Sequence, residues 1–277
     1  MEKQHTDSYK VMNITLNNGI KMPLLGFGTY LLRDGLECEH SVLNALNIGY
    51  RLIDTAAAYY NEESVGRAIK KSNVKREEIF VTTKFLPVDP GDEKSKRAFE
   101  TSLKKLGLDY IDLYLIHIPQ GDINSCWTAM EELYKEGKVR AIGVSNFNMN
   151  QIQNLLTQHS VIPAVNQVET HPFSQKTEMQ KALKSQGIQL ESWAPFAQGK
   201  NNLFNNELLK ALSSKYNKSI AQLVLRWLIQ KEVVVIPKSA NMKRINENFN
   251  VFDFELSSED MTTIKSLDKG SGLIYHV

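Results

Sequence analysis

The feature that most limits how this chain can fold is a regular alternation of short apolar runs with longer amphipathic stretches. The apolar runs are rich in β-branched residues, as buried strands are, and the stretches between them have helical spacing. Eight runs are predicted to be strands: Leu24–Gly28, Tyr50–Asp54, Ile79–Lys84, Tyr110–His117, Val139–Val144, Ala164–Val168, Gln189–Trp193 and Val233–Pro237. Strands that alternate with helices pair in parallel through right-handed crossovers. Eight such units predict an α/β fold, a single (β/α)₈ TIM barrel.

The stretches between the strands predict the helices that would cover this barrel. Their ranges are Glu39–Ile48, Glu62–Lys71, Lys94–Leu106, Ser125–Tyr134, Asn150–Leu156, Glu178–Ser185, Ile220–Ile229 and, after the last strand, Ser258–Leu267. Before the first strand, apolar residues alternate on both sides of Asn18-Gly19. Asn and Gly tolerate the positive φ of a tight turn, so an N-terminal β-hairpin is predicted there.

One domain over residues 1–277 is expected, because no segment rich in Pro, Gly or Ser interrupts the repeat. The polar residues 1–10 could form a flexible extension. The main alternative is a doubly wound open sheet. It is weakened because the only candidate for a GxGxxG motif, which begins Gly26-Phe27-Gly28, has Leu31 at its third glycine position.

Composition and charge argue against several classes of protein. The 33 basic and 31 acidic residues nearly cancel, so binding to nucleic acid by phosphate neutralisation is not expected. No apolar run approaches the ~18 residues of a membrane span, and no apolar segment near the N-terminus suggests a signal peptide. Cys38 and Cys126 lack zinc-site spacing and cannot build a disulfide framework. A cytoplasmic protein without metal, nucleic-acid or membrane partners is therefore expected.

Ionisable side chains follow neighbouring strands at the barrel rim where active sites form. Asp54 ends the second predicted strand, Lys84 the third and His117 the fourth, and Tyr59 follows Asp54 in the same loop. Taken singly, each residue has an ordinary structural explanation, such as a helix cap, a solvated charge or a polar loop. Their coincidence on one rim favours a site.

The chemistry of these four groups is coherent. A phenol has an ordinary pKa of about 10, too high for easy proton exchange at neutral pH. A lysine within ~4 Å could lower it by roughly 3 units, so Lys84 is expected to lower the pKa of Tyr59 and Asp54 to hold Lys84 in place. His117 would donate a hydrogen bond to a developing oxyanion. Such a set suits proton donation to a carbonyl oxygen.

Five segments make the sequence similar to a known family. They are GYRLIDTAAAYYNEESVG (49–66), VTTK (81–84), DLYLIHIP (112–119), KEGKVRAIGVSNF (135–147) and IPKSANMKRINENF (236–249). In this order they resemble signature segments of the aldo-keto reductases, and the similarity extends over about residues 11–267. The resemblance implies an oxidoreductase that reduces aldehydes or ketones with hydride from NADPH.

The resemblance also implies roles for individual residues. Asp54, Tyr59, Lys84 and His117 match the catalytic tetrad, with Tyr59 as proton donor. The other matches are cofactor positions: Ser145, Asn146 and Gln167 at the nicotinamide carboxamide, Trp193 against its ring, Gly28, Thr29 and Tyr30 in the first barrel loop, and Lys238, Ser239, Arg244, Glu247 and Asn248 at the adenosine end, with Asp54 also beside the cofactor. Lys238, Ser239 and Arg244 would favour NADPH over NADH.

The substrate end departs from many members of the family, with Ile118 and Leu86 at positions that are often Trp, and Tyr60 at one that is often Gly. An open pocket is expected for a small carbonyl compound. Its predicted borders are Tyr30, Tyr59, Phe85, His117 and Ile118, with the tail near Ile274 and Tyr275. Aldehydes, α-dicarbonyls, keto acids, sugars and prostanoid-like ketones all remain open as substrates.

Two other functions remain open. A non-catalytic NADP(H)-binding subunit that senses redox state could use the same fold, although the intact tetrad argues against it. A metal-dependent barrel hydrolase would need clustered ligands, and of six histidines only His117 clearly ends a strand. A monomer is the simplest expectation.

Overall fold

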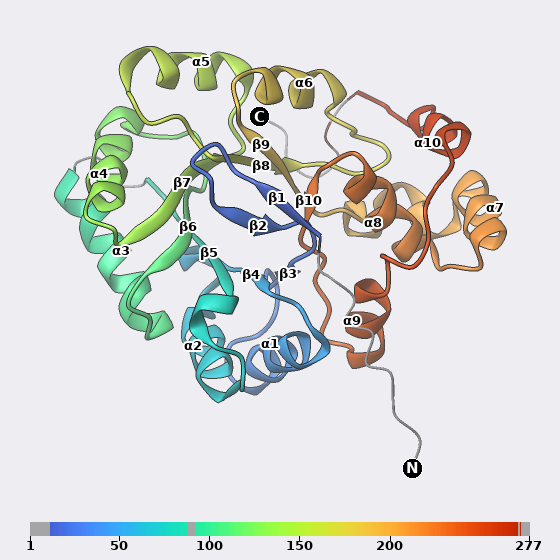
Figure 1. Ribbon diagram of the computed structural model, residues 1–277, viewed down its shortest axis with the longest axis horizontal. Coiled ribbons are helices and arrows are strands. Elements are labelled where there is room, and N and C mark those ends of the chain that lie inside the picture. The colour runs from blue at the N-terminus through green and yellow to red at the C-terminus, as the bar shows by residue number, and fades with distance from the viewer. Residues whose placement is uncertain (1–11, 88–91, 271, 273–277) are drawn as a thin grey trace.

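The computed structural model describes residues 12–87, 92–270 and 272 of the chain. Eight strands form one sheet: β3 (Phe27–Gly28), β4 (Leu52–Asp54), β5 (Phe80–Phe85), β6 (Ile111–Ile116), β7 (Val139–Ser145), β8 (Val165–Glu169), β9 (Gln189–Trp193) and β10 (Val234–Val235). Each strand pairs in parallel with the next one along the chain. The predicted (β/α)₈ barrel is thereby confirmed (Figure 1).

The barrel closes where its first and last strands meet. The amide of Gly26 donates to the Val235 carbonyl at 2.8 Å, and the Val235 amide donates to Leu24 at 2.9 Å. Closer to the carboxyl ends of these strands, a Cβ on Gly28 would lie 2.6 Å from the Ile236 carbonyl oxygen, so only glycine allows this close approach. The two strands are shorter than the predicted Leu24–Gly28 and Val233–Pro237, because the seam is an isolated bridge between Leu25 and Val235 instead of a continuous ladder.

Helices surround the sheet on the outside (Figure 1). They are α1 (Leu36–Ile48), α2 (Glu62–Lys71), α3 (Asp92–Leu106), α4 (Ile123–Lys135), α5 (Met149–Gln158), α6 (Thr177–Ser185), α7 (Glu207–Tyr216), α8 (Ile220–Gln230), α9 (Met242–Phe249) and α10 (Ser258–Lys265), with short 3₁₀ segments η1 (Ala57–Tyr59), η2 (Arg76–Glu78) and η3 (Ala197–Asn205). All eight predicted helices are present, whereas α7 and α9 were not predicted. In the described part of the chain no helix is both long enough and apolar enough to cross a bilayer.

The predicted hairpin is confirmed as β1 (Asn13–Thr15) and β2 (Lys21–Pro23), an antiparallel pair. It crosses the barrel in Figure 1 and covers the end where the strands begin. The Asn18 side chain donates to the Arg140 carbonyl at 2.9 Å, and Asn17 donates to Pro163 at 3.0 Å, near the starts of β7 and β8. The opposite rim, where the strands end, is therefore left open for a site. Residues 1–10, the predicted extension, lie outside the described residues.

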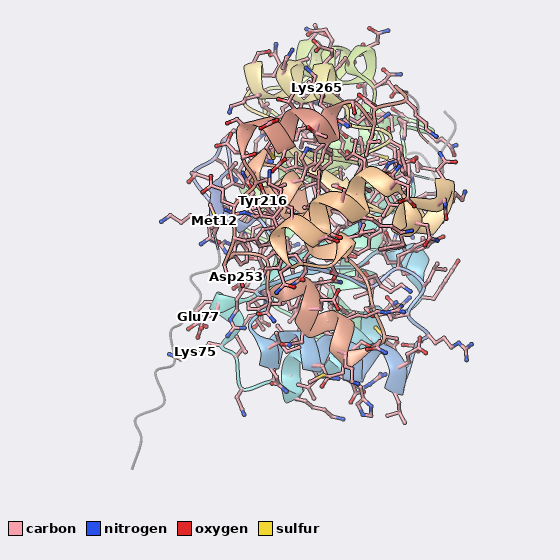
Figure 2. All side chains as sticks on the ribbon, turned by 90° about the vertical axis from the view of Figure 1, so that its right-hand side faces the viewer. Met12, Lys75, Glu77, Tyr216, Asp253 and Lys265 are labelled. Atoms are coloured by element: carbon pink, nitrogen blue, oxygen red, sulfur yellow. The ribbon has the colours of Figure 1, made fainter. Side chains whose placement is uncertain are left out.

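Polar side chains join the outer helices α7 and α10, on the face of the molecule where Figure 2 labels Tyr216 and Asp253. Asp260 of α10 accepts a hydrogen bond from Lys215 at 2.8 Å and another from the Tyr216 hydroxyl, both on α7. Beside them, Lys218 pairs with Asp253 at 2.5 Å. The two bonds to Asp260 hold α10 against α7.

Candidate active site

Lys84 is the centre of a buried polar cluster at the ends of β4 and β5. Its side chain has no exposed surface, and its Nζ donates to Asp54 Oδ1 at 2.6 Å and to the Thr55 carbonyl at 2.9 Å. The Tyr59 hydroxyl, in the 3₁₀ turn after β4, lies 3.3 Å from the same nitrogen. Gln167 Nε2 reaches across the barrel to the other carboxylate oxygen, Asp54 Oδ2, at 2.8 Å. Both oxygens of Asp54 therefore accept a hydrogen bond.

The charges in this cluster largely balance one another. Burial lowers the pKa of Lys84, but the Asp54 carboxylate outweighs this effect, so the net pKa is raised and Lys84 stays charged. Burial also raises the pKa of Tyr59, and Asp54 adds to the increase while Lys84 opposes it. The net pKa of Tyr59 is above its ordinary value. Lys84 therefore lowers the pKa of Tyr59, as predicted, but burial and Asp54 raise it by more.

His117 stands beside the phenol and is neutral. Its ring centroid lies 5.7 Å from that of Tyr59, with the two rings edge to face. Burial, with a smaller contribution from the positive charge of Lys84, lowers the pKa of His117 to about 3. Its Nδ1 is buried and has no hydrogen-bond partner among the described residues. A neutral imidazole carries one N–H and can donate it to a ligand oxygen.

A cavity of about 1170 Å³ opens over this cluster. Most of the predicted site residues line it: Gly28, Tyr30, Asp54, Tyr59, His117, Ile118, Ser145, Asn146, Gln167, Trp193, Lys238, Ser239, Arg244, Glu247 and Asn248. They come from the ends of several strands and from α9. The fold thus brings together groups that are up to about 220 residues apart in the sequence.

One wall of the cavity is held by Asn146, which directly follows β7. Asn146 adopts a left-handed conformation with φ 65°, which asparagine tolerates better than most residues. Its amide nitrogen donates to the His117 carbonyl at 3.0 Å, while its oxygen accepts from the Trp193 indole at 2.9 Å. Ser145 Oγ donates to the Gln167 carbonyl at 2.8 Å. These bonds fix the indole at the cavity edge.

The far end of the cavity is cationic and is organised by α9. Asn241 caps this helix by accepting from the Lys243 and Arg244 amides. Lys238 and Arg244 are exposed, whereas Ser239 and Asn248 are buried beside them. The Glu247 carboxylate accepts a hydrogen bond from Ser219, the N-cap of α8. Two exposed cations and two buried polar side chains therefore meet at one end of the cavity.

Of the predicted site residues that the structure describes, three do not line this cavity. Lys84 is buried, and its Nζ lies 3.3 Å from the hydroxyl of Tyr59, which does line the cavity. Thr29 is buried, and its hydroxyl donates to the Asp54 carbonyl at 3.0 Å. Phe85 was expected to border the substrate, but it stacks on Tyr114 with ring centroids 5.1 Å apart. Neighbouring residues of a strand face opposite sides, so the inward Lys84 directs Phe85 outward. Ile274 and Tyr275, also predicted there, lie outside the described residues.

Other residues that line the cavity were missed by the sequence analysis. They include Leu31, Ala58, Ala194, Pro195, Phe196, Gln198, Gly199, Phe204, Ser219, Ile220, Ala221 and Ile236. Several lie in η3, the loop after β9, where barrel loops generally carry binding residues. Glu191 was also missed, a buried carboxyl two residues before Trp193 in β9. The sequence feature that could have indicated Glu191 is a charged residue inside a predicted strand, on the same strand face as Trp193.

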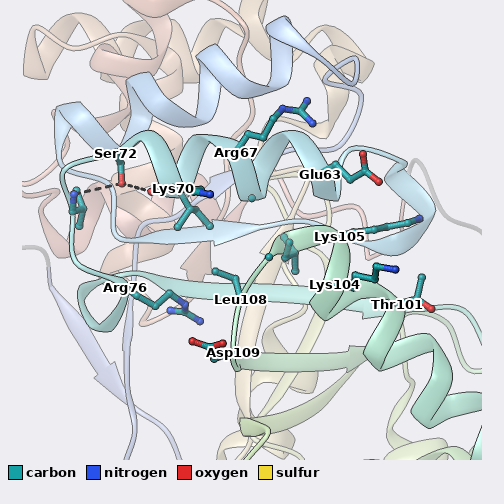
Figure 3. A pocket seen from close by; sticks show the side chains of 15 residues that line it. Glu63, Arg67, Lys70, Ser72, Arg76, Thr101, Lys104, Lys105, Leu108 and Asp109 are labelled. Atoms are coloured by element: carbon teal, nitrogen blue, oxygen red, sulfur yellow. Dashed lines mark hydrogen bonds between the residues drawn. The ribbon is translucent and has the colours of Figure 1, made fainter.

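A second cavity of about 1000 Å³ lies between α2 and α3 (Figure 3). Its lining includes Lys70, Lys104 and Lys105, and it contains none of the predicted site residues. Within the described residues there is also no group of three or more His, Cys, Asp or Glu side chains arranged to hold a metal ion. The polar cluster at the strand ends is therefore the candidate active site.

Fold and site together define a (β/α)₈ barrel enzyme with a buried Lys–Asp–Tyr–His cluster at the strand ends. The family model described as "Aldo/keto reductase family" matches residues 25–269. The chain belongs to this family, and it is an oxidoreductase whose family uses a nicotinamide cofactor.

Similar proteins support this assignment over nearly the whole chain. The glyoxal reductase of Bacillus subtilis (strain 168) is 51% identical over 257 residues, which cover 92% of each chain. An aldo-keto reductase enzyme from a Medee basin deep-sea metagenome library has a crystal structure with a TM-score of 0.92 and 49% identity, covering 95% of this chain and 97% of the other. An aldo-keto reductase of Bombyx mori, crystallised in complex with NADP, has a TM-score of 0.89 and 36% identity, covering 94% of both chains.

Proposed function

We propose that this protein reduces small aldehydes and ketones with NADPH, that α-dicarbonyl compounds are its preferred substrates, and that Tyr59 is the proton donor. The observation that carries the proposal is the Tyr59 hydroxyl, which lines the large cavity and lies 3.3 Å from the ammonium of Lys84. No other described tyrosine hydroxyl contacts Lys84 within hydrogen-bond distance. The same cavity carries a flat indole, polar amides and a cationic end, which suit a dinucleotide.

The residues around the cavity fit NADPH. The amides of Asn146 and Gln167 lie near the Tyr59 end, where they could hydrogen-bond a carboxamide, and Trp193 offers a flat face to a ring. Lys238 and Arg244 at the other end could hold a ribose phosphate, because phosphate pairs well with lysine and with the forked guanidinium. The crystallised relative that holds NADP supports the choice of cofactor. Bound in this way, NADPH would supply the hydride that reduces the carbonyl carbon.

Tyr59 performs the proton transfer in the proposed mechanism. Its raised pKa keeps the phenol protonated at neutral pH, as a proton donor must be. As the proton leaves for the substrate oxygen, negative charge develops on the phenol oxygen next to Lys84. The lysine, held charged by Asp54 and itself buried, stabilises that charge.

Neutral His117 orients the substrate in the proposed mechanism. Because its low pKa keeps it uncharged, it donates one N–H to the carbonyl oxygen and does not compete with Tyr59 as an acid. Its position edge-on to the Tyr59 ring lets both donors approach one oxygen. Asp54 and Gln167 do not contact the substrate in this scheme, and they keep Lys84 in place.

The preference for small α-dicarbonyl compounds rests on the substrate end and on one relative. Ile118 lines the cavity at a position where many members of the family have the larger Trp, so it leaves more room for substrate. The half-exposed Tyr30 lines the cavity beside Tyr59, with the two ring centroids 5.0 Å apart. The 51% identical relative is named a glyoxal reductase, and glyoxal is the smallest α-dicarbonyl compound. An electron-poor carbonyl also accepts hydride more readily.

A panel of carbonyl compounds with NADPH tests this function. We expect oxidation of NADPH with glyoxal, methylglyoxal and simple aldehydes, and the largest kcat/KM with the α-dicarbonyls. Added chelator should leave the rates unchanged. NADPH binding without any turnover would contradict the proposal and would favour a redox-sensing subunit, whereas turnover with a larger kcat/KM for sugars or bulky ketones would overturn only the substrate preference.

A further inference from the structure

Glu191 is a buried carboxyl that the mechanism above does not use. It lies in the middle of β9, has 0% of its surface exposed, and neither carboxyl oxygen has a hydrogen-bond partner among the described residues. Side chains two residues apart on a strand share a face, so Glu191 lies one layer below Trp193 inside the barrel. Burying a carboxyl group without a hydrogen-bond partner costs folding free energy, so its position needs an explanation.

The neighbours of Glu191 connect it to the active site. Its partner in the parallel register is Gln167 on β8, whose amide nitrogen is bonded to Asp54 at 2.8 Å. Asp54 is bonded to Lys84, and Lys84 contacts Tyr59. On the β10 side its register partner is the apolar Val234. The groups that act on the charge of Glu191 are therefore Asp54, Lys84 and the Gln167 amide.

These surroundings favour the uncharged form of Glu191. Burial and then the negative charge of Asp54 raise its pKa to about 8, while the Gln167 amide and Lys84 act in the opposite direction. Below that pH the cluster contains one anion, Asp54, and one cation, Lys84. Above it a second anion appears in the barrel close to the pair. That charge would oppose the negative charge that forms on Tyr59 as its proton leaves.

We propose that Glu191 is a positioning residue for carbonyl reduction: in its neutral form, beside Gln167, it leaves the Lys84–Asp54 pair balanced, and in its charged form it weakens proton donation by Tyr59. The inference rests on the proposed function for the reaction that it modulates. The presence of a protonated carboxyl in the free enzyme can be measured without any substrate.

The kinetic test compares the pH dependence of kcat for the wild type and Glu191→Gln. Glutamine has nearly the same shape and is always neutral. We expect the wild-type kcat to fall roughly tenfold in a step near pH 8, and the variant to lack that step while matching the wild type below it. Glu169→Gln is the matched control, because Glu169 is also buried, on neighbouring β8, and is bonded to His171 at 2.9 Å. This control should keep the step.

Infrared spectroscopy measures the protonation of Glu191 directly, and a purely structural role would give no carboxyl band that changes with pH. The wild-type spectrum minus that of Glu191→Gln should contain a protonated-carboxyl band that disappears as the pH passes about 8. Following the band in the wild type alone covers the case in which the variant does not fold. Reduction with no such band at low pH, or a step that persists in folded Glu191→Gln, would overturn the role of Glu191 alone. A band without any carbonyl reduction would instead overturn the proposed function, and the role of Glu191 in it.

Discussion

The ammonium of Lys84 lies 2.6 Å from the carboxylate of Asp54, and neither residue has appreciable contact with solvent. The opposite charges of a buried ion pair largely cancel in their effect on neighbouring groups, so Lys84 lowers the pKa of a neighbouring acid less than an unpaired lysine would. Together with burial, which is the larger cause, this explains why the pKa of Tyr59 stays above its usual value although Lys84 is only 3.3 Å away. The phenol is therefore protonated at neutral pH, as the proposed proton donor must be.

Tyr59→Phe should abolish reduction while the cofactor still binds. Loss of one positioned proton donor typically lowers kcat by about 10²–10⁴-fold. The measurement is kcat with glyoxal, together with the Kd of NADPH. Tyr60→Phe is the matched control, because the neighbouring Tyr60 is 80% exposed and should be dispensable. A Tyr59→Phe variant that retained more than about a tenth of the wild-type kcat would assign the proton to another group.

Lys84→Met should be nearly inactive, and its defect should be electrostatic. Methionine keeps most of the length and removes the positive charge that lowers the pKa of Tyr59. With Asp54 left unbalanced, the pKa of the phenol rises further, so the alkaline limb of the residual activity should move to higher pH. The pH profile of kcat checks this. A near-normal rate with an unmoved profile would make Lys84 a structural residue only.

Lys238→Met and Arg244→Met should each weaken the binding of NADPH more than the binding of NADH. The two cofactors differ by one phosphate, and a charge-assisted hydrogen bond contributes about 1.5–3 kcal/mol, or roughly 10- to 150-fold in Kd. Calorimetry or quenching of tryptophan fluorescence gives both constants. Lys243→Met is the control, because this exposed lysine of α9 does not line the cavity. Equal weakening of both cofactors would mean that the two cations do not bind the phosphate.

Ile118→Trp should narrow the range of substrates. The larger ring would occupy the substrate end of the cavity, so kcat/KM for a bulky aromatic aldehyde should fall by roughly 10- to 200-fold. Glyoxal, which needs little room, should lose much less. A uniform loss for large and small substrates would indicate that the substitution disturbs the neighbouring His117 instead of the available volume.

Stability should decrease in acid because His117 resists protonation in the fold. Its folded pKa of about 3 is below the ordinary value near 6.5, so unfolded chains bind a proton that folded ones reject. This contribution is fully present above about pH 6.5 and is lost, at up to ~1.4 kcal/mol per pH unit, as the pH falls towards 3. Urea unfolding at several pH values checks the prediction. His117→Gln should lose less stability over the same range, and an equal loss would contradict it.

The barrel and most of the active site could be predicted because their signals are local. Alternation of apolar runs and helical spacing depends on neighbouring residues, and strands in a parallel barrel bring their carboxyl ends to one rim. That is why Asp54, Tyr59, Lys84 and His117 could be placed together before any contact was known. Helices α7 and α9 escaped detection because they follow irregular loops, although Asn241 is a plausible cap for α9.

Other properties were decided only by tertiary contacts. The sequence by itself determined the strands, their order and the ionisable groups at their ends, because each depends on residues close together in the chain. It did not reveal that Phe85 turns away from the site towards Tyr114, or that Gln167 reaches Asp54 from 113 residues away. The protonation states of Tyr59 and Glu191 belong to the same class, since they depend on burial and on charges brought across the barrel. Desolvation and electrostatic coupling act between neighbours in space, and only the closed barrel makes these residues neighbours.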